Sequence, residues 1–101
     1  MITSGAVAPR RDTDQELYVV ILSNDIHIAA RTGRVIVCPF IPGRLADDTM
    51  AMVIAVDQPE GTLLPELVQW LPSAGLGEPI GTIGATEMRQ TAAIVTALMT
   101  S

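Results

Sequence analysis

The sequence has 101 residues, enough for one compact domain, and 49% of them are apolar against 17% charged, which excludes a disordered acidic chain. The formal net charge is −5, so binding of a polyanion such as nucleic acid would depend on a local cluster of the six basic residues, all of them arginine. A mean hydropathy of +0.40 is high for a soluble monomer and favours a homodimer.

The sequence indicates a cytoplasmic protein. No apolar stretch reaches the roughly 18 residues needed to cross a bilayer, so no membrane association is expected. Near the N-terminus, Arg10 and Arg11 follow the weakly apolar segment, which is the reverse of the order in a signal peptide. Cys38 is the only cysteine, so no internal disulfide forms, and its apolar surroundings predict a buried, inert thiol.

The first half of the chain reads as strands separated by polar turns. Residues 2–8 form a weak candidate strand, and the wholly polar residues 10–16 predict a loop. Residues 17–22 (LYVVIL) are a continuous apolar run rich in β-branched side chains, which predicts a central strand buried on both faces. Residues 23–31 are less regular, and Thr32-Gly33 marks a turn.

The next two apolar runs predict further strands. Residues 35–41 (VIVCPFI) predict a second buried strand, which must be an edge or carry a bulge at Pro39 because proline cannot donate to a ladder. Residues 50–56 (MAMVIAV) predict a third strand, followed by a turn. Residues 62–71 are ambiguous, because their apolar residues have helical spacing in a segment that also suits a strand.

The end of the chain predicts one short strand and one helix. Residues 80–83 form the strand, and Met88, Ala92, Val95 and Met99 recur at helical spacing after it. Several short strands followed by a helix predict a mainly β fold with one C-terminal α-helix. The expected architecture is a small, partly open antiparallel β-barrel in a single domain, residues 1–101.

Three segments carry a resemblance that covers nearly the whole chain. VVILSND at 19–25 is similar to a strand that ends in a polar loop, and GRVIVCPFIPGR at 33–44 to the strand after it. GTIGATEMRQTAAIVTAL at 81–98 is similar to a closing segment that leads into a terminal helix. In order and spacing these segments resemble the MazF/CcdB superfamily, the toxins of type II toxin–antitoxin systems. The resemblance implies an SH3-like barrel and favours a strand for residues 62–71.

The resemblance implies a toxin but leaves its activity open. MazF-like members are endoribonucleases that cleave single-stranded RNA without a metal, whereas CcdB-like members poison DNA gyrase without catalysis. Both kinds are homodimers that a cognate antitoxin neutralises with a disordered tail. The sequence is interpreted as a MazF-like endoribonuclease that cleaves single-stranded mRNA, with no cofactor and no metal. A CcdB-like gyrase poison and a degenerate member that only binds antitoxin are the alternatives.

The resemblance also locates the expected active site. Leu17 and Ile41 stand where the ribonuclease branch has a catalytic Arg and a Thr or Ser, and neither side chain transfers a proton or binds a phosphate oxygen. Any cleavage must therefore use other groups. The candidate catalytic residues are Arg11, Arg44 and His27, the last lying on one face with Asp25 if the segment is extended.

The remaining candidates are contact residues. Arg10, Arg31 and Arg34 are candidates for RNA binding, and Trp70, Met88 and Met99 for a dimer or antitoxin interface, because tryptophan is enriched at contact sites and methionine adapts to them. The Trp-Gly-Ile terminus through which CcdB-like toxins contact gyrase is replaced here by Met99-Thr100-Ser101.

Overall fold

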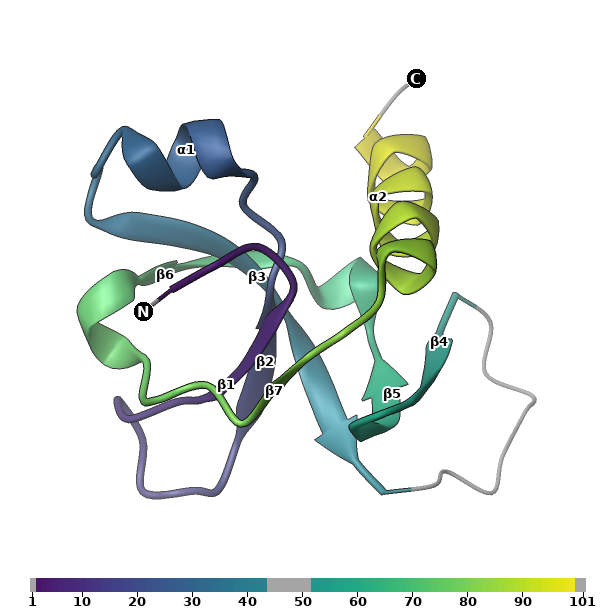
Figure 1. Ribbon diagram of the computed structural model, residues 1–101, viewed down its shortest axis with the longest axis horizontal. Helices are drawn as coiled ribbons and strands as arrows, with labels where there is room; N and C mark the ends of the chain where they lie inside the picture. The colour runs from purple at the N-terminus through teal and green to yellow at the C-terminus, as the bar shows by residue number, and fades with distance from the viewer. Residues whose placement is uncertain (1, 44–51, 100–101) are drawn as a thin grey trace.

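The computed structural model describes residues 2–43 and 52–99. Its elements follow the chain as seven strands, two α-helices and two single-turn 3-10 helices (Figure 1). Their bounds are β1 (Ala6–Pro9), β2 (Tyr18–Ile21), α1 (Asp25–Ala29), β3 (Arg34–Pro42), β4 (Ile54–Asp57), β5 (Glu60–Leu63), η1 (Pro65–Leu67), β6 (Gln69–Pro72), η2 (Ser73–Gly75), β7 (Gly81–Thr82) and α2 (Ala85–Met99).

The strands form one antiparallel sheet in the order β4-β5-β3-β2-β1-β7, with β6 also paired to β3. Strand β3 shares its outer edge between two partners, since residues 34–37 pair with β6 and residues 40–42 with β5. Pro39 falls between them. Its carbonyl oxygen accepts from the backbone N–H of Leu64 at 3.1 Å, so its nitrogen faces the same gap. The sequence predicted an edge or a bulge at Pro39, and the structure has a gap in the pairing of β3 there, between its β6 and β5 partners.

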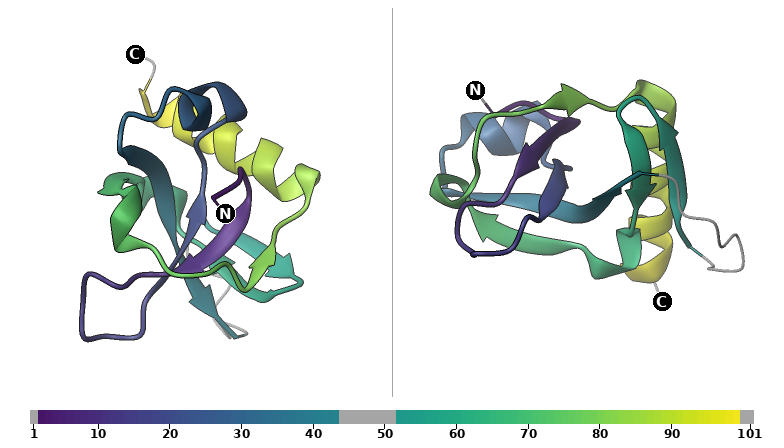
Figure 2. Two further views of the ribbon diagram at one scale, coloured as in Figure 1. Left: turned by 60° about the vertical axis from the view of Figure 1, so that its left-hand side comes forward. Right: turned by 90° about the horizontal axis from the view of Figure 1, so that it is seen from below.

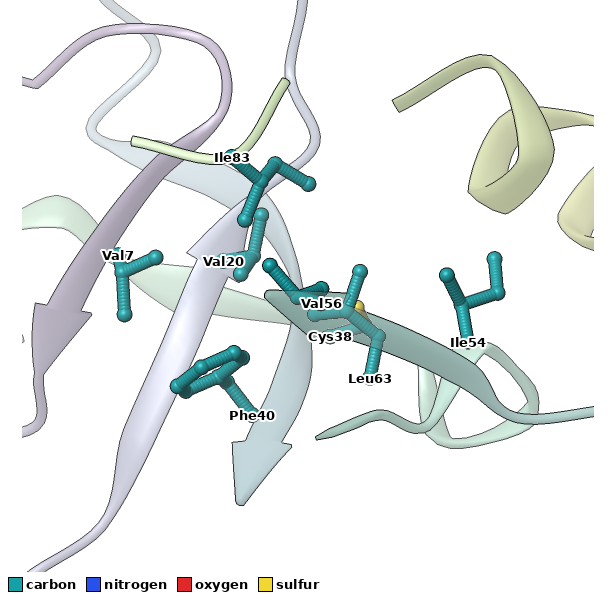
Figure 3. Packing of buried hydrophobic residues seen from close by; sticks show 8 residues of the cluster. All are labelled: Val7, Val20, Cys38, Phe40, Ile54, Val56, Leu63 and Ile83. Atoms are coloured by element: carbon teal, nitrogen blue, oxygen red, sulfur yellow. The ribbon is translucent and has the colours of Figure 1, made fainter. Parts of the chain in front are cut away.

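The sheet curls around a core that joins its two ends. This core is a cluster of buried side chains. Some come from β4, at one end of the strand order, and others from β1 and the residue after β7, at the other end (Figure 3). They are Val7, Val20, Cys38, Phe40, Ile54, Val56, Leu63 and Ile83. Across the seam, a Cβ on Gly81 of β7 would lie 3.3 Å from the ring of Pro59 in the β4–β5 turn. Side chains thus close the barrel where the strand order is open, and the predicted fold class is confirmed.

The outer face of the sheet carries a second core. Val19 and Ile21 point to this face whereas Val20 points into the barrel, so β2 is buried on both faces as its sequence predicted. The N-terminal segment, α1 and the segment after β6 cover the cluster with Ile2, Ile28 and Leu76. Helix α2 lies instead on the β4–β5 side of the molecule, away from α1 (Figures 1 and 2).

The prediction for residues 23–31 was incomplete, because the segment contains α1. Asn24 starts the helix by accepting the backbone N–H of His27 on its side-chain oxygen at 2.8 Å. Residues 62–71 resolve into the end of β5, the turn η1 and most of β6, so the helical spacing there produced a single turn between two strands. Strand β4 begins at Ile54, and residues 50 and 51 of the predicted third strand lie outside the described residues.

Cys38 has the environment that the sequence predicted. Its side chain is fully buried in the barrel, and burial raises the pKa of the thiol to about 12. It is therefore a neutral packing residue at physiological pH. No helix in the described part of the chain is long and apolar enough to cross a membrane.

Candidate functional site

A groove lies between the β1–β2 loop and the end of β3, two segments at the lower end of the sheet as drawn in Figure 1. We call it the β2–β3 groove, and its volume is about 300 Å³. Leu17 and Ile41, the two positions expected to hold catalytic residues, both line it, and each is 39% exposed. The groove is lined by Arg10, Glu16, Leu17, Tyr18, Val19, Pro39, Phe40, Ile41, Pro42 and Gln69. The resemblance and the geometry therefore point to the same place.

Two polar pairs stand at this groove. Arg10 donates from Nε and Nη2 to the two carboxylate oxygens of Asp12, at 2.9 and 2.8 Å. This paired contact raises the pKa of Arg10 and lowers the pKa of Asp12. The Tyr18 hydroxyl donates to Glu16 Oε1 at 2.9 Å, and this hydrogen bond raises the pKa of Tyr18. The groove thus holds one cation, one carboxylate and one phenol against mainly apolar walls.

Arg11 lies outside this groove, although it was the first catalytic candidate. Its backbone N–H donates to the carbonyl of Gly75 at 2.7 Å, and its side chain packs on Gly77, where a Cβ would lie 2.8 Å from Nε. Arg10 extends β1 by one residue through a β-bridge to Leu76. The side chains of Arg10 and Arg11 therefore point to opposite sides, as neighbours in an extended segment do. The structure therefore brings Arg10, and not Arg11, into the groove.

His27 lies at the other end of the sheet. Its Nδ1 is 2.7 Å from Ser23 Oγ, which also accepts the backbone N–H of Ile36, and its ring meets Trp70 edge-on at a centroid distance of 5.7 Å. The segment is helical and not extended, so the expected shared face of Asp25 and His27 is wrong: residues two apart on a helix point in different directions. His27 joins α1 to β3 and β6, and the structure separates it from Arg10.

Two of the other candidate arginines, Arg31 and Arg34, lie away from the groove. Arg31 and Arg34 line a different pocket of about 220 Å³ beside Thr32 and Ser73. Arg34 and Ile41 are seven residue steps apart on β3, roughly 23 Å along the strand. Arg44 lies outside the described residues. Among residues 2–43 and 52–99, no group of three or more His, Cys, Asp or Glu side chains could hold a metal ion.

A second groove lies between α2 and the segments at Leu22 and Ile36, and Met88 is the interface candidate that lines it. We call this groove the α2 face. Its volume is about 170 Å³, and it is lined by Leu22, Ile36, Met88, Ala92, Val95 and Thr96. Trp70 pairs with Ile36 across the strands and is 59% exposed, so it is not a core residue. Met88 packs partly on the barrel core, whereas Met99 is 77% exposed at the helix end.

Comparison with known proteins identifies the family. The model of the family described as "Type II toxin-antitoxin system toxin Rv0299" matches residues 5–98 of this chain. The chain belongs to this family of type II toxins. Toxin Rv0299 of Mycobacterium tuberculosis is 62% identical over 99 residues, which cover 98% of this chain and 99% of the relative.

Solved structures agree with the family on the fold. An endoribonuclease in complex with its cognate antitoxin, from a mycobacterial species, matches with a TM-score of 0.76 and 17% identity over 100% of both chains. MazE–MazF of Deinococcus radiodurans matches with a TM-score of 0.80 and 14% identity over 97% of this chain and 94% of the other. The MazF-like fold and the toxin identity that the sequence predicted are thus confirmed.

Sequence reasoning missed Glu16 and Tyr18 as members of the site. Glu16 belongs to the polar segment 10–16 and Tyr18 to the apolar run 17–22, and neither pattern marks a site residue. A signal was present, because these two polar side chains flank Leu17, the residue at an expected catalytic position. Residues two apart in an extended segment share a face, which brings the hydroxyl of one to the carboxylate of the other.

Proposed function

We propose that this toxin is a metal-independent endoribonuclease that cleaves single-stranded mRNA in the β2–β3 groove and so inhibits growth from the cytoplasm. One observation carries the proposal: Arg10, a cation, lines the same groove as Leu17 and Ile41. The charge that the ribonuclease branch supplies from the Leu17 position is here supplied from a neighbouring residue. The fold shared with solved endoribonucleases supports this proposal.

Attack of a ribose 2′-hydroxyl on the neighbouring phosphate develops negative charge on the phosphate oxygens. A guanidinium that donates two parallel hydrogen bonds suits those oxygens, because carboxylates and phosphates present the same two-oxygen geometry. Arg10 already holds Asp12 in this manner. The proposal therefore has an RNA phosphate replace Asp12 on Arg10, which leaves the cation in the groove and in contact with the reacting group.

The mainly apolar walls of the groove favour a second candidate, a toxin that binds a protein target such as DNA gyrase without catalysis. Leu17 and Ile41 offer partly exposed apolar surface that suits the apolar side chains of a protein. In that case the groove is a docking surface, and RNA stays intact. A member that has lost both activities and binds only its antitoxin remains the third alternative.

One experiment separates the three. The purified protein is incubated with total RNA in EDTA and, separately, with gyrase and supercoiled DNA. The proposal expects RNA fragments that end in a cyclic phosphate, with no need for a metal. Intact RNA with stabilised gyrase cleavage complexes would move the protein to the second class. No effect on either target, with antitoxin binding retained, would identify the degenerate member.

We also propose that the toxin is a homodimer whose antitoxin is a separate protein with an apolar recognition segment. The α2 face supports the dimer, because its lining is mainly apolar, and because Trp70, paired with the lining residue Ile36, and Met99, at the end of α2, expose further apolar surface. A second copy would cover this surface on both subunits at once, as an isologous interface does. The partner named in the solved endoribonuclease complex supports the antitoxin.

A further inference from the structure

The ionisable side chains among the described lining of the β2–β3 groove are Arg10, Glu16 and Tyr18. Arg10 is a permanent cation and transfers no proton near neutral pH. The remaining two are already joined, since the Tyr18 hydroxyl donates to one oxygen of the Glu16 carboxylate at 2.9 Å. The second oxygen of that carboxylate accepts no hydrogen bond from the described residues, and Glu16 is exposed to the solvent. A proton acceptor and a proton donor thus stand side by side in the groove.

We propose that Glu16 and Tyr18 are the general base and the general acid of RNA cleavage in this groove, acting as one hydrogen-bonded pair beside Arg10. This inference rests on the proposed ribonuclease function. Glu16, Leu17 and Tyr18 all line the groove, so the pair is placed to supply the proton transfers that the Leu17 side chain cannot perform. His27, the other titratable candidate, is excluded from this role by its place at the opposite end of β3.

The proton balance of the reaction fits the pair. The free oxygen of Glu16 takes the proton of the 2′-hydroxyl while the 2′-oxygen forms its bond to phosphorus. The bond from phosphorus to the 5′-oxygen breaks, and that oxygen takes the proton of Tyr18. The products are a 2′,3′-cyclic phosphate and a free 5′-hydroxyl. Glu16 is exposed, so after product release the protonated carboxyl loses its proton to water and the Tyr18 phenolate takes one from water, which restores the pair with no net change in protons.

The electrostatics agree with these roles. The carboxylate of Glu16 keeps Tyr18 protonated, because its hydrogen bond raises the pKa of the phenol. A phenol remains able to protonate the leaving 5′-alkoxide, since an alkoxide is the stronger base. Arg10, released from Asp12 by the RNA phosphate, balances the charge on the non-bridging oxygens.

The test compares purified wild-type protein with Glu16→Gln, Tyr18→Phe and the double variant on a short fluorogenic RNA, across a range of pH. Each single variant should lower kcat about 100-fold or more, and the double variant should be little worse, because the two groups act as a unit. The acid limb of the pH–rate profile, where a carboxylate base becomes protonated, should disappear in Glu16→Gln. Glu66→Gln, an exposed carboxylate on η1 outside the groove, is the matched control and should keep wild-type kinetics.

Two further measurements distinguish a loss of catalysis from a folding defect. Thermal melting should be unchanged in each variant, and RNA affinity should stay within about threefold, so that the loss falls on kcat. Wild-type cleavage together with variants of normal rate and normal pH profile would overturn this inference and leave the ribonuclease proposal standing. A wild-type protein that leaves RNA intact would overturn both.

Discussion

Arg10 and Arg11 are neighbours in sequence but occupy different environments. Arg10 lines the β2–β3 groove and holds Asp12, whereas Arg11 packs on Gly77 outside it. The sequence located both in a polar loop but did not reveal which one faces the groove. That choice depends on the bridge between Arg10 and Leu76, a contact between segments far apart in the chain that no local pattern encodes.

The difference gives a direct prediction for RNA cleavage. Removing a positioned cation commonly costs about 100–1,000-fold in rate, so Arg10→Ala should nearly abolish cleavage and Arg11→Ala should have a much smaller effect. Arg89→Ala, on the exposed side of α2, is the control. Initial rates on one RNA substrate check the series. A larger loss from Arg11→Ala than from Arg10→Ala would mean that RNA lies on the other side of the loop.

Cys38 should be chemically silent in the folded protein. Its pKa of about 12 lies far above neutrality, so the reactive thiolate becomes a main species only as the pH approaches that value. We expect no alkylation by iodoacetamide between pH 7 and 9 until denaturant exposes the thiol, and full alkylation afterwards. Mass spectrometry of the intact chain measures both. Rapid labelling of the native protein at pH 7 would contradict the buried position.

At the scale of elements, α2 shows that apolar periodicity predicts a helix but not which side of the helix is buried. The spacing of Met88, Ala92, Val95 and Met99 predicted the helix, and the helix is present. The side of α2 that packs on the barrel instead contains Thr91, the buried residue of this helix. The Thr91 hydroxyl donates to the carbonyl of Glu87 at 2.8 Å. The apolar stripe is therefore turned partly away from the core, which leaves Ala92 and Met99 exposed.

This orientation predicts the effect of charge on assembly. Ala92→Glu places a carboxylate in the α2 face and should convert a homodimer at micromolar concentration into a monomer of about 11 kDa, the chain mass being 10.7 kDa. Ala97→Glu is the matched control, because nine positions separate residue 97 from Met88, two and a half turns at 3.6 residues per turn, and place it on the opposite side. Sedimentation velocity distinguishes the states. A monomeric wild-type protein would rule out the dimer.

Strands β2 and β3 were predictable from the sequence, whereas helix α1 was not. The strands β2 and β3 followed from apolar runs, which report burial directly. Helix α1 is five residues long and leaves Ile26 81% exposed, so it presents no buried stripe that a pattern could reveal. It is held by the Asn24 cap and by the contacts of His27 with Ser23 and Trp70.

At the scale of the whole molecule, charge decides how an antitoxin is recognised. The toxin carries a net charge of −5 and also exposes apolar side chains outside the α2 face, among them Leu17, Ile41 and Ile80. An antitoxin segment should therefore bind mainly through apolar contacts, with an affinity that changes only a few-fold between 50 and 500 mM salt, because salt screens charges and not apolar burial. Isothermal titration at several salt concentrations measures this dependence. A steep loss of affinity with salt would favour recognition through the arginines.

The barrel seam has a consequence for the breathing of the molecule. The strand order ends at β4 and β7, and Pro59 bridges the seam by packing on Gly81. The β4–β5 hairpin is thus tied to β7 by packing alone, whereas β2 and β3 have hydrogen-bonded partners on both sides. Local openings that move this hairpin outward should need less free energy than other openings of the core. The backbone amides of the hairpin should therefore exchange with deuterium well before those of β2. The native state would then open along one fixed line, at the seam opposite the central strands.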